Sequence, residues 1–186
     1  AGFAAALRII ILGTVALNLD WTLALGVIAI MTMTVGNIAA IMQKNLARML
    51  AYSSIGHAGY ILMAVIAKNS LGSSSLLFYM LSYAFMTFGV FGIVIILGRK
   101  GEENLEIKNY SGLAYKHPVI ALSMTIFLLS LAGLPPFAGF VAKFYLFSAA
   151  IQEGLLTLVI IAVLNSAISF YYYLKVVVFM YMEEPE

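Results

Sequence analysis

The longest apolar run of the sequence extends from Pro118 to Ala150 and reads PVIALSMTIFLLSLAGLPPFAGFVAKFYLFSAA. A continuous helix of these 33 residues would be about 50 Å long, whereas the hydrocarbon core of a bilayer is about 30 Å thick. The residues GLPPFAG at 133–139 interrupt the run, and two successive prolines remove two backbone donors and clash with the preceding turn. The pattern predicts a membrane helix that is broken at residues 133–136.

Such a break has two interpretations. A helix interrupted inside the membrane is tolerated where its freed carbonyls meet protein or water, and in transporters these interruptions commonly line the ion path. Two short helices joined by a loop near one membrane face would use the same residues. The position of the break along the span separates the two interpretations.

The composition indicates a membrane protein. Hydrophobic residues make up 63% of the chain and charged residues only 10%, against roughly 25% charged residues in soluble domains. The 10 basic and 8 acidic residues nearly cancel, which gives no support to nucleic-acid binding. The absence of Cys excludes thiolate-ligated iron-sulfur clusters and Cys-based zinc sites in this chain. We expect no cofactor and no metal here, so any redox chemistry belongs to a partner.

Five further apolar segments accompany the broken one. They cover Gly2–Leu19, Trp21–Met42, about Arg48–Ala67, about Leu76–Gly98 and Gly154–Met182. The last four have the roughly 20 residues that a spanning helix needs, and lipid admits only helices or closed barrels. We therefore predict an all-α polytopic membrane protein with six transmembrane segments. Because the chain opens inside an apolar stretch without an initiator Met, we expect a piece of a longer protein.

Basic residues gather on one side of the predicted spans. That side holds Lys44, Arg48, Arg99, Lys100, Lys108 and Lys116, and the other holds Lys68. The positive-inside rule makes the first side cytoplasmic, together with the tail at 183–186. Ordinary anchoring explains Lys44 and Arg48 adequately. A part for Lys44 in delivering protons from the cytoplasm is the secondary interpretation.

The ionisable residues predicted at mid-membrane depth are basic, because all eight acids fall in loops or at the terminus. Lys143 lies nine residues before Gln152, on the second half of the broken helix. Desolvation at this depth disfavours the charged form of a lysine with no acid in reach, which suits it to gain and lose a proton. The alternative is a lysine that snorkels to an interface, and nine residues is too deep for this to happen easily.

Three other helices offer polar groups at similar depth. His57 lies nine residues after Arg48, about 13 Å deep, and an imidazole carries protons in either direction. A neutral histidine hydrogen-bonded inside a bundle would look the same. Tyr83, Asn165 and Ser166 could hold water chains or bond a neighbouring helix.

Two stretches resemble a known family. They are residues 36–60, GNIAAIMQKNLARMLAYSSIGHAGY, and residues 130–145, SLAGLPPFAGFVAKFY. Both closely resemble the antiporter-like membrane subunits of complex I type enzymes. The run at 165–176, NSAISFYYYLKV, narrows the resemblance to one branch of that family. One departure is Ala47, where many members have Lys immediately before the arginine that is Arg48 here, and Lys44 lies three residues earlier.

The resemblance implies a fold of about fourteen transmembrane helices with two inverted five-helix repeats. Residues 20–182 would then be the second repeat, 1–19 the end of the preceding helix, and 183–186 a cytoplasmic tail. The family's proton-transfer residues match Lys143, His57 and Tyr83. The implied partners are other membrane-arm subunits, a peripheral redox arm, lipid and protons, in an energy-converting membrane such as the prokaryotic cell membrane.

Three other functions stay open at this point. A subunit of a cation/proton antiporter or of a membrane-bound hydrogenase would share the lysine of the broken helix, and sodium dependence of ion flux would reveal it. A non-pumping scaffold predicts that neutralising Lys143 leaves pumping intact. A carrier of small organic solutes predicts substrate binding at the break.

Overall fold

The computed structural model describes residues 21–98 and 106–184. The described helices are α2 (Thr22–Ile41), α3 (Leu46–Ile66), α4 (Ser70–Leu97), the 3-10 turn η1 (Ile107–Tyr110), α5 (Leu113–Lys116), α6 (Pro118–Ala132), α7 (Ala138–Gln152) and α8 (Leu156–Met182). The segment predicted at Gly2–Leu19 and the basic pair Arg99 and Lys100 lie outside the described residues.

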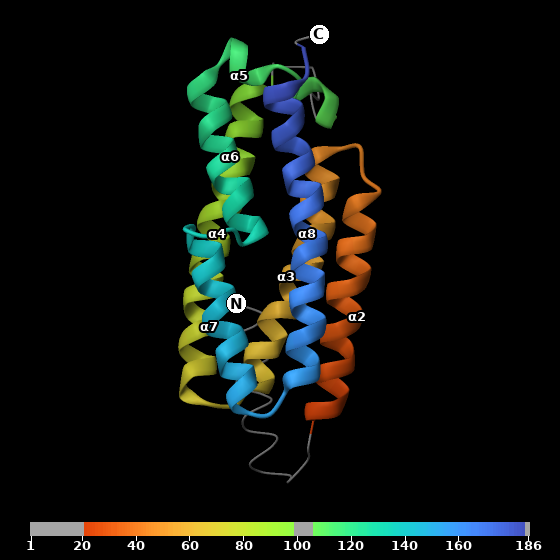
Figure 1. Cartoon of the computed structure of the whole chain (residues 1–186), viewed down its shortest axis with the longest axis vertical. Helices are drawn as coiled ribbons and strands as arrows, with labels where there is room; N and C mark the ends of the chain where they lie inside the picture. Colours follow the sequence, from red (N-terminus) through yellow and green to blue (C-terminus); the bar gives the residue numbers. More distant parts are fainter. Residues whose placement is uncertain (1–20, 99–105, 185–186) are drawn as a thin grey trace.

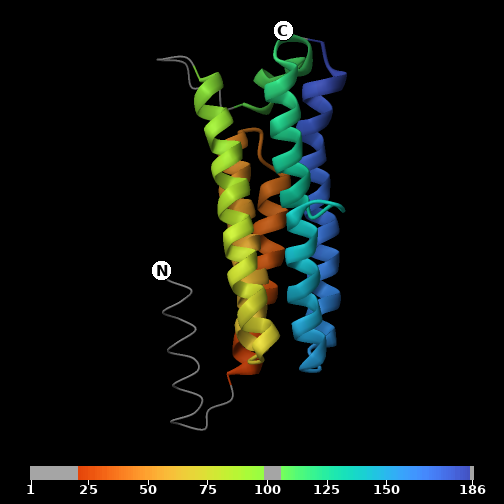
Figure 2. The same cartoon turned by 90° about the vertical axis from the view of Figure 1, so that its left-hand side faces the viewer.

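The long helices stand side by side in an elongated bundle, and α6 and α7 follow one another along its axis (Figures 1 and 2). Four described helices, α2, α3, α4 and α8, are long and apolar enough to cross a bilayer, whereas α6 and α7 are shorter apolar helices. In the 18-residue apolar stretch of α3, 67% of the residues are buried, against 28% in the corresponding stretches of α2 and α4. The helix α3 therefore forms the centre of the bundle. The all-helical fold is confirmed, and the six-span count and the inverted repeat stay predictions.

The predicted break separates α6 from α7. Gly133 ends α6 in the left-handed region at φ +86°, a conformation that favours glycine. The backbone amides of Gly133 and Leu134 both donate to the carbonyl of Leu129, at 3.1 Å each, and so close the last turn. In both views the connection lies about midway along the bundle, which agrees with an interruption inside the span (Figures 1 and 2).

The start of α4 differs from the prediction. We expected a helix from about Leu76, but α4 begins at Ser70, because the side chain of Asn69 accepts a 2.6 Å hydrogen bond from Gly72 N and caps the first turn. The serines at 73–75 lie inside this helix. The hydroxyl of Ser75, for example, donates to the carbonyl of Gly72 at 2.9 Å.

Asn69 also joins two turns at one end of the bundle. Its side-chain amide donates to the carbonyl of Ala149 and to Oε1 of Glu153, at 3.0 Å each. Replacing Asn69 by Ala removes the cap and both bonds, and we expect a loss of about 2 kcal/mol in the free energy of unfolding. Thermal unfolding of the detergent-solubilised full-length subunit measures it. Ser73→Ala, which removes one exposed hydroxyl from the same turn, serves as the control.

The polar loop before α6 contains structure that the sequence analysis did not predict. Ile107, Tyr110 and Leu113 are buried and pack over the end of the bundle. The amide of Gly112 donates to the carbonyl of Phe179 at 3.2 Å, and the amide of Ile107 donates to the carbonyl of Lys44 at 2.9 Å. This segment therefore ties the α2–α3 turn to the end of α8.

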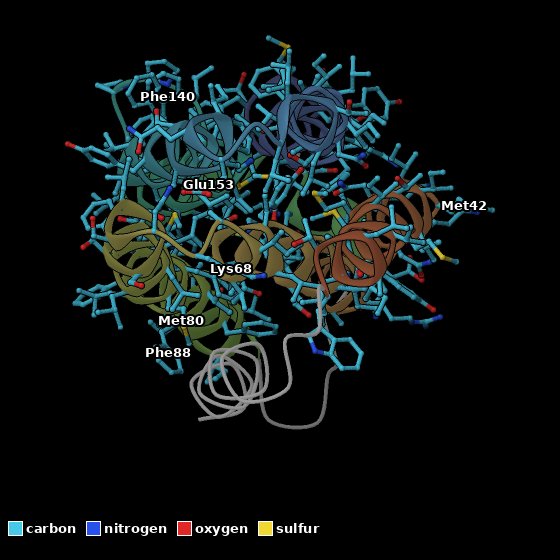
Figure 3. The ribbon with its side chains drawn as sticks, turned by 90° about the horizontal axis from the view of Figure 1, so that it is seen from below. Met42, Lys68, Met80, Phe88, Phe140 and Glu153 are labelled. Carbon is cyan, nitrogen blue, oxygen red and sulfur yellow. The ribbon has the colours of Figure 1, made fainter. Side chains whose placement is uncertain are left out.

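The outer surface of the bundle is apolar. Many large apolar side chains are exposed, among them Leu23 at 81% and Phe88 at 77%. Seen along the bundle axis, Met42, Phe88 and Phe140 lie at the periphery (Figure 3). Exposed apolar area on this scale fits contact with lipid or with other membrane helices.

Candidate functional site

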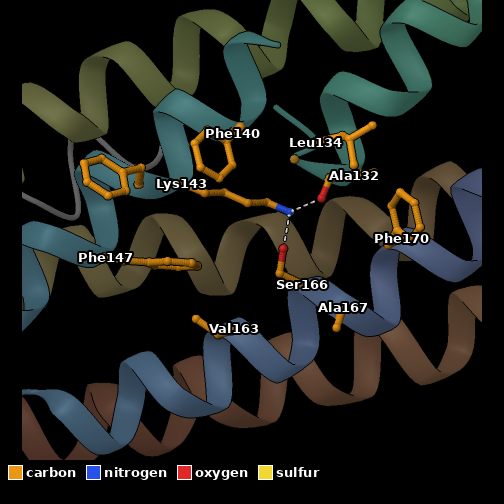
Figure 4. Close-up of a pocket in the computed structure, with 11 residues that line it drawn as sticks. Ala132, Leu134, Phe140, Lys143, Phe147, Val163, Ser166, Ala167 and Phe170 are labelled. Atoms are coloured by element: carbon orange, nitrogen blue, oxygen red, sulfur yellow. Dashed lines mark hydrogen bonds between the residues drawn. The ribbon is translucent and has the colours of Figure 1, made fainter. Parts of the chain in front are cut away.

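Lys143 lies in the second turn of α7, beside the break, and is only 4% exposed. Its Nζ donates to the carbonyl of Ala132 at 2.9 Å and to Ser166 Oγ at 2.8 Å (Figure 4). Ala132 is the last residue of α6, so the break frees the carbonyl that the lysine uses. The carboxyl end of a helix also carries partial negative charge, which favours a cation there. The broken helix therefore supplies the principal backbone partner of Lys143.

The space for Lys143 depends on the glycine at the break. A Cβ atom at Gly133 would lie 2.9 Å from Cδ and 3.1 Å from Nζ of the lysine. Gly133 is thus required both for the left-handed turn and for the passage of the lysine side chain.

An apolar cavity of about 410 Å³ adjoins the lysine. Its lining includes no acid, and the side chains around Lys143 and Ser166 are apolar, four of them phenylalanines: Phe140, Phe144, Phe147 and Phe170. The predicted burial of the lysine is confirmed, and its contacts exclude the snorkelling interpretation. The amine is held by neutral acceptors in surroundings of low polarity.

His57, on α3, is 3% exposed and engages both of its ring nitrogens. Nδ1 lies 2.7 Å from the hydroxyl of Tyr79, and Nε2 lies 3.2 Å from the hydroxyl of Tyr173. Tyr83, another of the predicted site residues, contacts the imidazole through its ring, with centroids 4.7 Å apart. Sequence reasoning missed Tyr79 and Tyr173. Tyr79 lies four residues before Tyr83, on the same face of α4, and that spacing was the available signal.

Tyr60 lies between the lysine and the histidine. Its ring centroid is 5.2 Å from Nζ of Lys143 and 6.0 Å from the ring centroid of His57. A protonated lysine at this distance is attracted to the ring face. The buried hydroxyl of Tyr60 makes no hydrogen bond of normal geometry within the described part of the chain, although the side chain of Asn37 lies near enough to interact with it.

This missing bond gives a prediction. Replacing Tyr60 by Phe keeps the ring and removes only the unpaired hydroxyl, so we expect a change in unfolding free energy within about 0.5 kcal/mol, or a gain. Tyr173→Phe, which breaks the contacts with Ser53 and His57, is expected to cost about 1–3 kcal/mol. Thermal unfolding of the two full-length variants compares them, and equal losses would contradict this assignment.

The other candidates lie either in the interior of the bundle or at its end. In the interior, Ser166 accepts a hydrogen bond from Lys143, and the Asn165 side chain donates to the carbonyl of Ile161 at 3.0 Å. Lys44 is exposed in the α2–α3 turn and lines a separate cavity of about 280 Å³ with Lys108, Lys175 and three other residues. The structure therefore places Lys44 apart from the buried lysine. No group of three or more potential metal ligands occurs in the described ranges, and the absence of a cofactor stays a prediction.

The sequence was also compared with known proteins. A family model described as NADH:quinone oxidoreductase/Mrp antiporter, TM, matches residues 1–169. The chain belongs to this family. Over 186 residues it is 53% identical to NADH-quinone oxidoreductase subunit N of Trichlorobacter lovleyi, covering all of this chain and 38% of the relative. The chain thus spans well under half the length of this curated relative. The resemblance noted in the sequence is confirmed, and the branch indicated by residues 165–176 is that of subunit N.

Solved structures of the family share the fold. A chain of respiratory complex I from Thermus thermophilus, with bound aureothin, matches with a TM-score of 0.76 and 34% identity, over 88% of this chain and 36% of that one. A chain of the Mrp complex from a Dietzia species matches with a TM-score of 0.78 and 28% identity, over 89% and 31% respectively. The family therefore includes both respiratory complexes and Mrp assemblies.

Proposed function

We propose that this chain is part of a proton-translocating subunit in the membrane arm of a complex I type NADH-quinone oxidoreductase, in a prokaryotic cell membrane. Partner subunits, including a peripheral redox arm, would supply the redox energy, and Lys143 would be the site that holds and releases the proton. The observation that carries the proposal is the burial of this lysine between neutral acceptors at a helix break.

The partners of Lys143 suit both of its protonation states. The ammonium form donates to Ala132 O and Ser166 Oγ and faces the ring of Tyr60. The neutral amine can still donate to Ala132 O, while its lone pair accepts the hydroxyl proton of Ser166, because a serine hydroxyl both donates and accepts. A proton can therefore arrive or leave without breaking a fixed ion pair, which is the property that a relay needs.

His57 and its tyrosines would form the next part of the path. Tyr60 contacts both the lysine and the histidine, and a path past Tyr60 would join them. The partially exposed Tyr83, whose ring is tilted against that of His57, adjoins a cavity of about 400 Å³. In this proposal protons are the only substrate of the chain, and electrons, quinone and nicotinamide belong to other subunits.

Similarity to the Mrp complex supports a second candidate, a cation/proton antiporter subunit. The identity to complex I subunit N relatives is higher, at up to 53%, which favours the respiratory assignment. Burying a lysine beside an apolar cavity is energetically costly, and a scaffold that transfers no protons would not need one.

Ion flux separates these candidates. The complete enzyme with its full-length subunit, in inverted membrane vesicles, is given NADH and a quinone, and proton uptake is followed in sodium-containing and sodium-free buffers. We expect equal proton uptake in both buffers. Uptake that requires sodium, or sodium movement coupled to protons in the opposite direction, would favour the antiporter and contradict the proposal.

A further inference from the structure

A cavity of about 280 Å³ at one end of the bundle gathers three lysines from three separate segments. Lys44 comes from the turn between α2 and α3, Lys108 from η1 and Lys175 from α8. Glu106 is the single acid in the described lining of this cavity. The lining therefore carries more positive than negative charge, whereas Lys143 is the one charged residue that lines the larger cavity at the helix break.

Backbone contacts bring two of these lysines together. The amide of Ile107 donates to the carbonyl of Lys44 at 2.9 Å, and Asn45 and Glu106 form an isolated antiparallel bridge. Ile107 is buried, so the segment that carries Lys108 is anchored to the bundle. Lys44 and Lys108 therefore line one cavity because their backbones pair, and not through the chance position of two exposed side chains.

The same segment is joined to α8. The amide of Gly112, two residues after η1, donates to the carbonyl of Phe179 at 3.2 Å. Phe179 lies four residues after Lys175, so the two side chains share one face of α8, and both line the cavity. Lys175 is half-buried, and a lysine in such a place packs its apolar stem against its neighbours and keeps its amine in polar surroundings. The cavity supplies those surroundings.

The three amines lack a compensating acid. In the part of the chain that the structure describes, no carboxylate oxygen lies within 4.0 Å of the amine of Lys44, Lys108 or Lys175. Gathering like charges is unfavourable, and an anion among them offsets the repulsion. Ammonium groups donate strong hydrogen bonds to phosphate oxygens, and a phosphate has an oxygen for each of three amines, whereas a carboxylate has only two oxygens. The lining therefore suits a phosphate group.

The neighbouring surface favours a phosphate that belongs to a lipid. On the membrane side of Lys44, Ile38 and Met42 of α2 are 51% and 76% exposed, and Met42 lies at the periphery of the bundle (Figure 3). On the membrane side of Lys175, Tyr171 is 61% exposed. Acyl chains can lie against these side chains, whereas a soluble anion would gain nothing from them. The cavity is also smaller than the roughly 300–1,000 Å³ that encloses a drug-sized ligand, so it has room for a headgroup while the chains stay outside.

We propose that the cavity lined by Lys44, Lys108 and Lys175 binds the phosphate headgroup of an anionic phospholipid. The bound phosphate would accept hydrogen bonds from three segments and so hold the α2–α3 turn, η1 and α8 together. The positive-inside pattern assigns this end of the bundle to the cytoplasmic side, where basic pockets between membrane helices bind such headgroups. The inference does not rest on the proposed function, because lipid binding requires no proton transfer.

Native mass spectrometry of the detergent-solubilised full-length subunit tests the proposal. The subunit is titrated separately with three probes: dioleoylphosphatidylglycerol, dioleoylphosphatidylcholine and glycerol phosphate. Phosphatidylcholine has the same phosphate and acyl chains but adds a cation, and glycerol phosphate has no acyl chains. We expect phosphatidylglycerol to bind at least about fivefold more tightly than either of the other two probes, since each lysine near an anionic headgroup contributes about that factor.

Two variants remove a charge from the cavity. Lys108→Gln and Lys175→Gln keep much of the side-chain length, and in each we expect phosphatidylglycerol to bind about fivefold more weakly, with phosphatidylcholine binding unchanged. Lys116→Gln is the matched control, because it removes the same charge from α5, at the same end of the bundle, and Lys116 is not among the residues that line the cavity. The control is expected to bind phosphatidylglycerol within about twofold of the wild type.

Three outcomes would overturn the proposal. Equal binding of phosphatidylglycerol and phosphatidylcholine by the wild type would show that the lysines do not select an anionic headgroup. A loss in Lys116→Gln as large as in the two cavity variants would show that only the overall charge of this end attracts the lipid. Glycerol phosphate that binds as tightly as phosphatidylglycerol would assign the cavity to a soluble anion. Thermal unfolding without added lipid checks that each variant is folded.

Discussion

Replacing Lys143 by Ala in the full-length subunit is expected to stop proton transfer through this subunit while the complex still assembles and oxidises NADH. The substitution removes the only buried group that the broken helix offers for holding a proton in the described part of the chain. Loss of a positioned proton-transfer group typically slows the step about a hundredfold or more. Proton uptake per NADH oxidised, in inverted vesicles, measures the effect, and native gel electrophoresis checks assembly separately.

Two further variants make the result interpretable. Lys143→Met keeps most of the side-chain volume and should fail in the same way, which separates the loss of the amine from the loss of packing. Lys68→Ala removes a lysine from the turn between α3 and α4, far from the break along the chain, and should pump normally. Normal pumping by both Lys143 variants would leave the lysine structural and favour the scaffold.

The placement of Lys143 could be predicted from the sequence because few residues determine it. Two prolines break the helix, and a lysine seven residues after the second proline must then lie near the break. The polar residues of α8 were also expected at matching depth, and Ser166 does meet the lysine. The backbone carbonyl of Ala132 could not be foreseen, because which carbonyl is freed depends on how Gly133 ends α6.

The histidine shows where sequence reasoning stops. Depth along α3 placed His57 in the interior, but the rotation of α4 and α8 about their own axes decides which tyrosines reach it. On α4, Tyr79 and Tyr83 share one face. Their spacing therefore could not show that Tyr79 hydrogen-bonds the histidine whereas Tyr83 contacts it through its ring. The α4 start was missed for a different reason: the prediction followed the apolar residues alone, whereas Asn69 caps a first turn that is rich in serine.

Replacing Gly139 by Ala is expected to disrupt the site through the backbone. A Cβ atom at Gly139 would lie 1.7 Å from the carbonyl oxygen of Ser130, and the Gly139 amide donates to Ser130 Oγ at 3.1 Å. The obstacle is backbone, so α6 and α7 must separate, and we expect a loss of about 3 kcal/mol in unfolding free energy. Ala132 lies two residues after Ser130, and Lys143 lies four residues after Gly139. The separation would therefore also draw Ala132 O away from Lys143.

Gly92→Ala is the matched control for this substitution. It makes the same chemical change inside α4, where nothing lies within 4 Å of the added methyl group, and alanine is favoured over glycine in a helix by roughly 0.5–1 kcal/mol. The two variants should therefore shift the thermal unfolding of the full-length subunit in opposite directions. Since Gly139→Ala leaves the lysine itself unchanged, a parallel loss of proton uptake would show that the amine acts only when the two halves of the broken helix hold it. If Gly139→Ala unfolded like Gly92→Ala, the close approach of α6 and α7 would not be what positions Lys143.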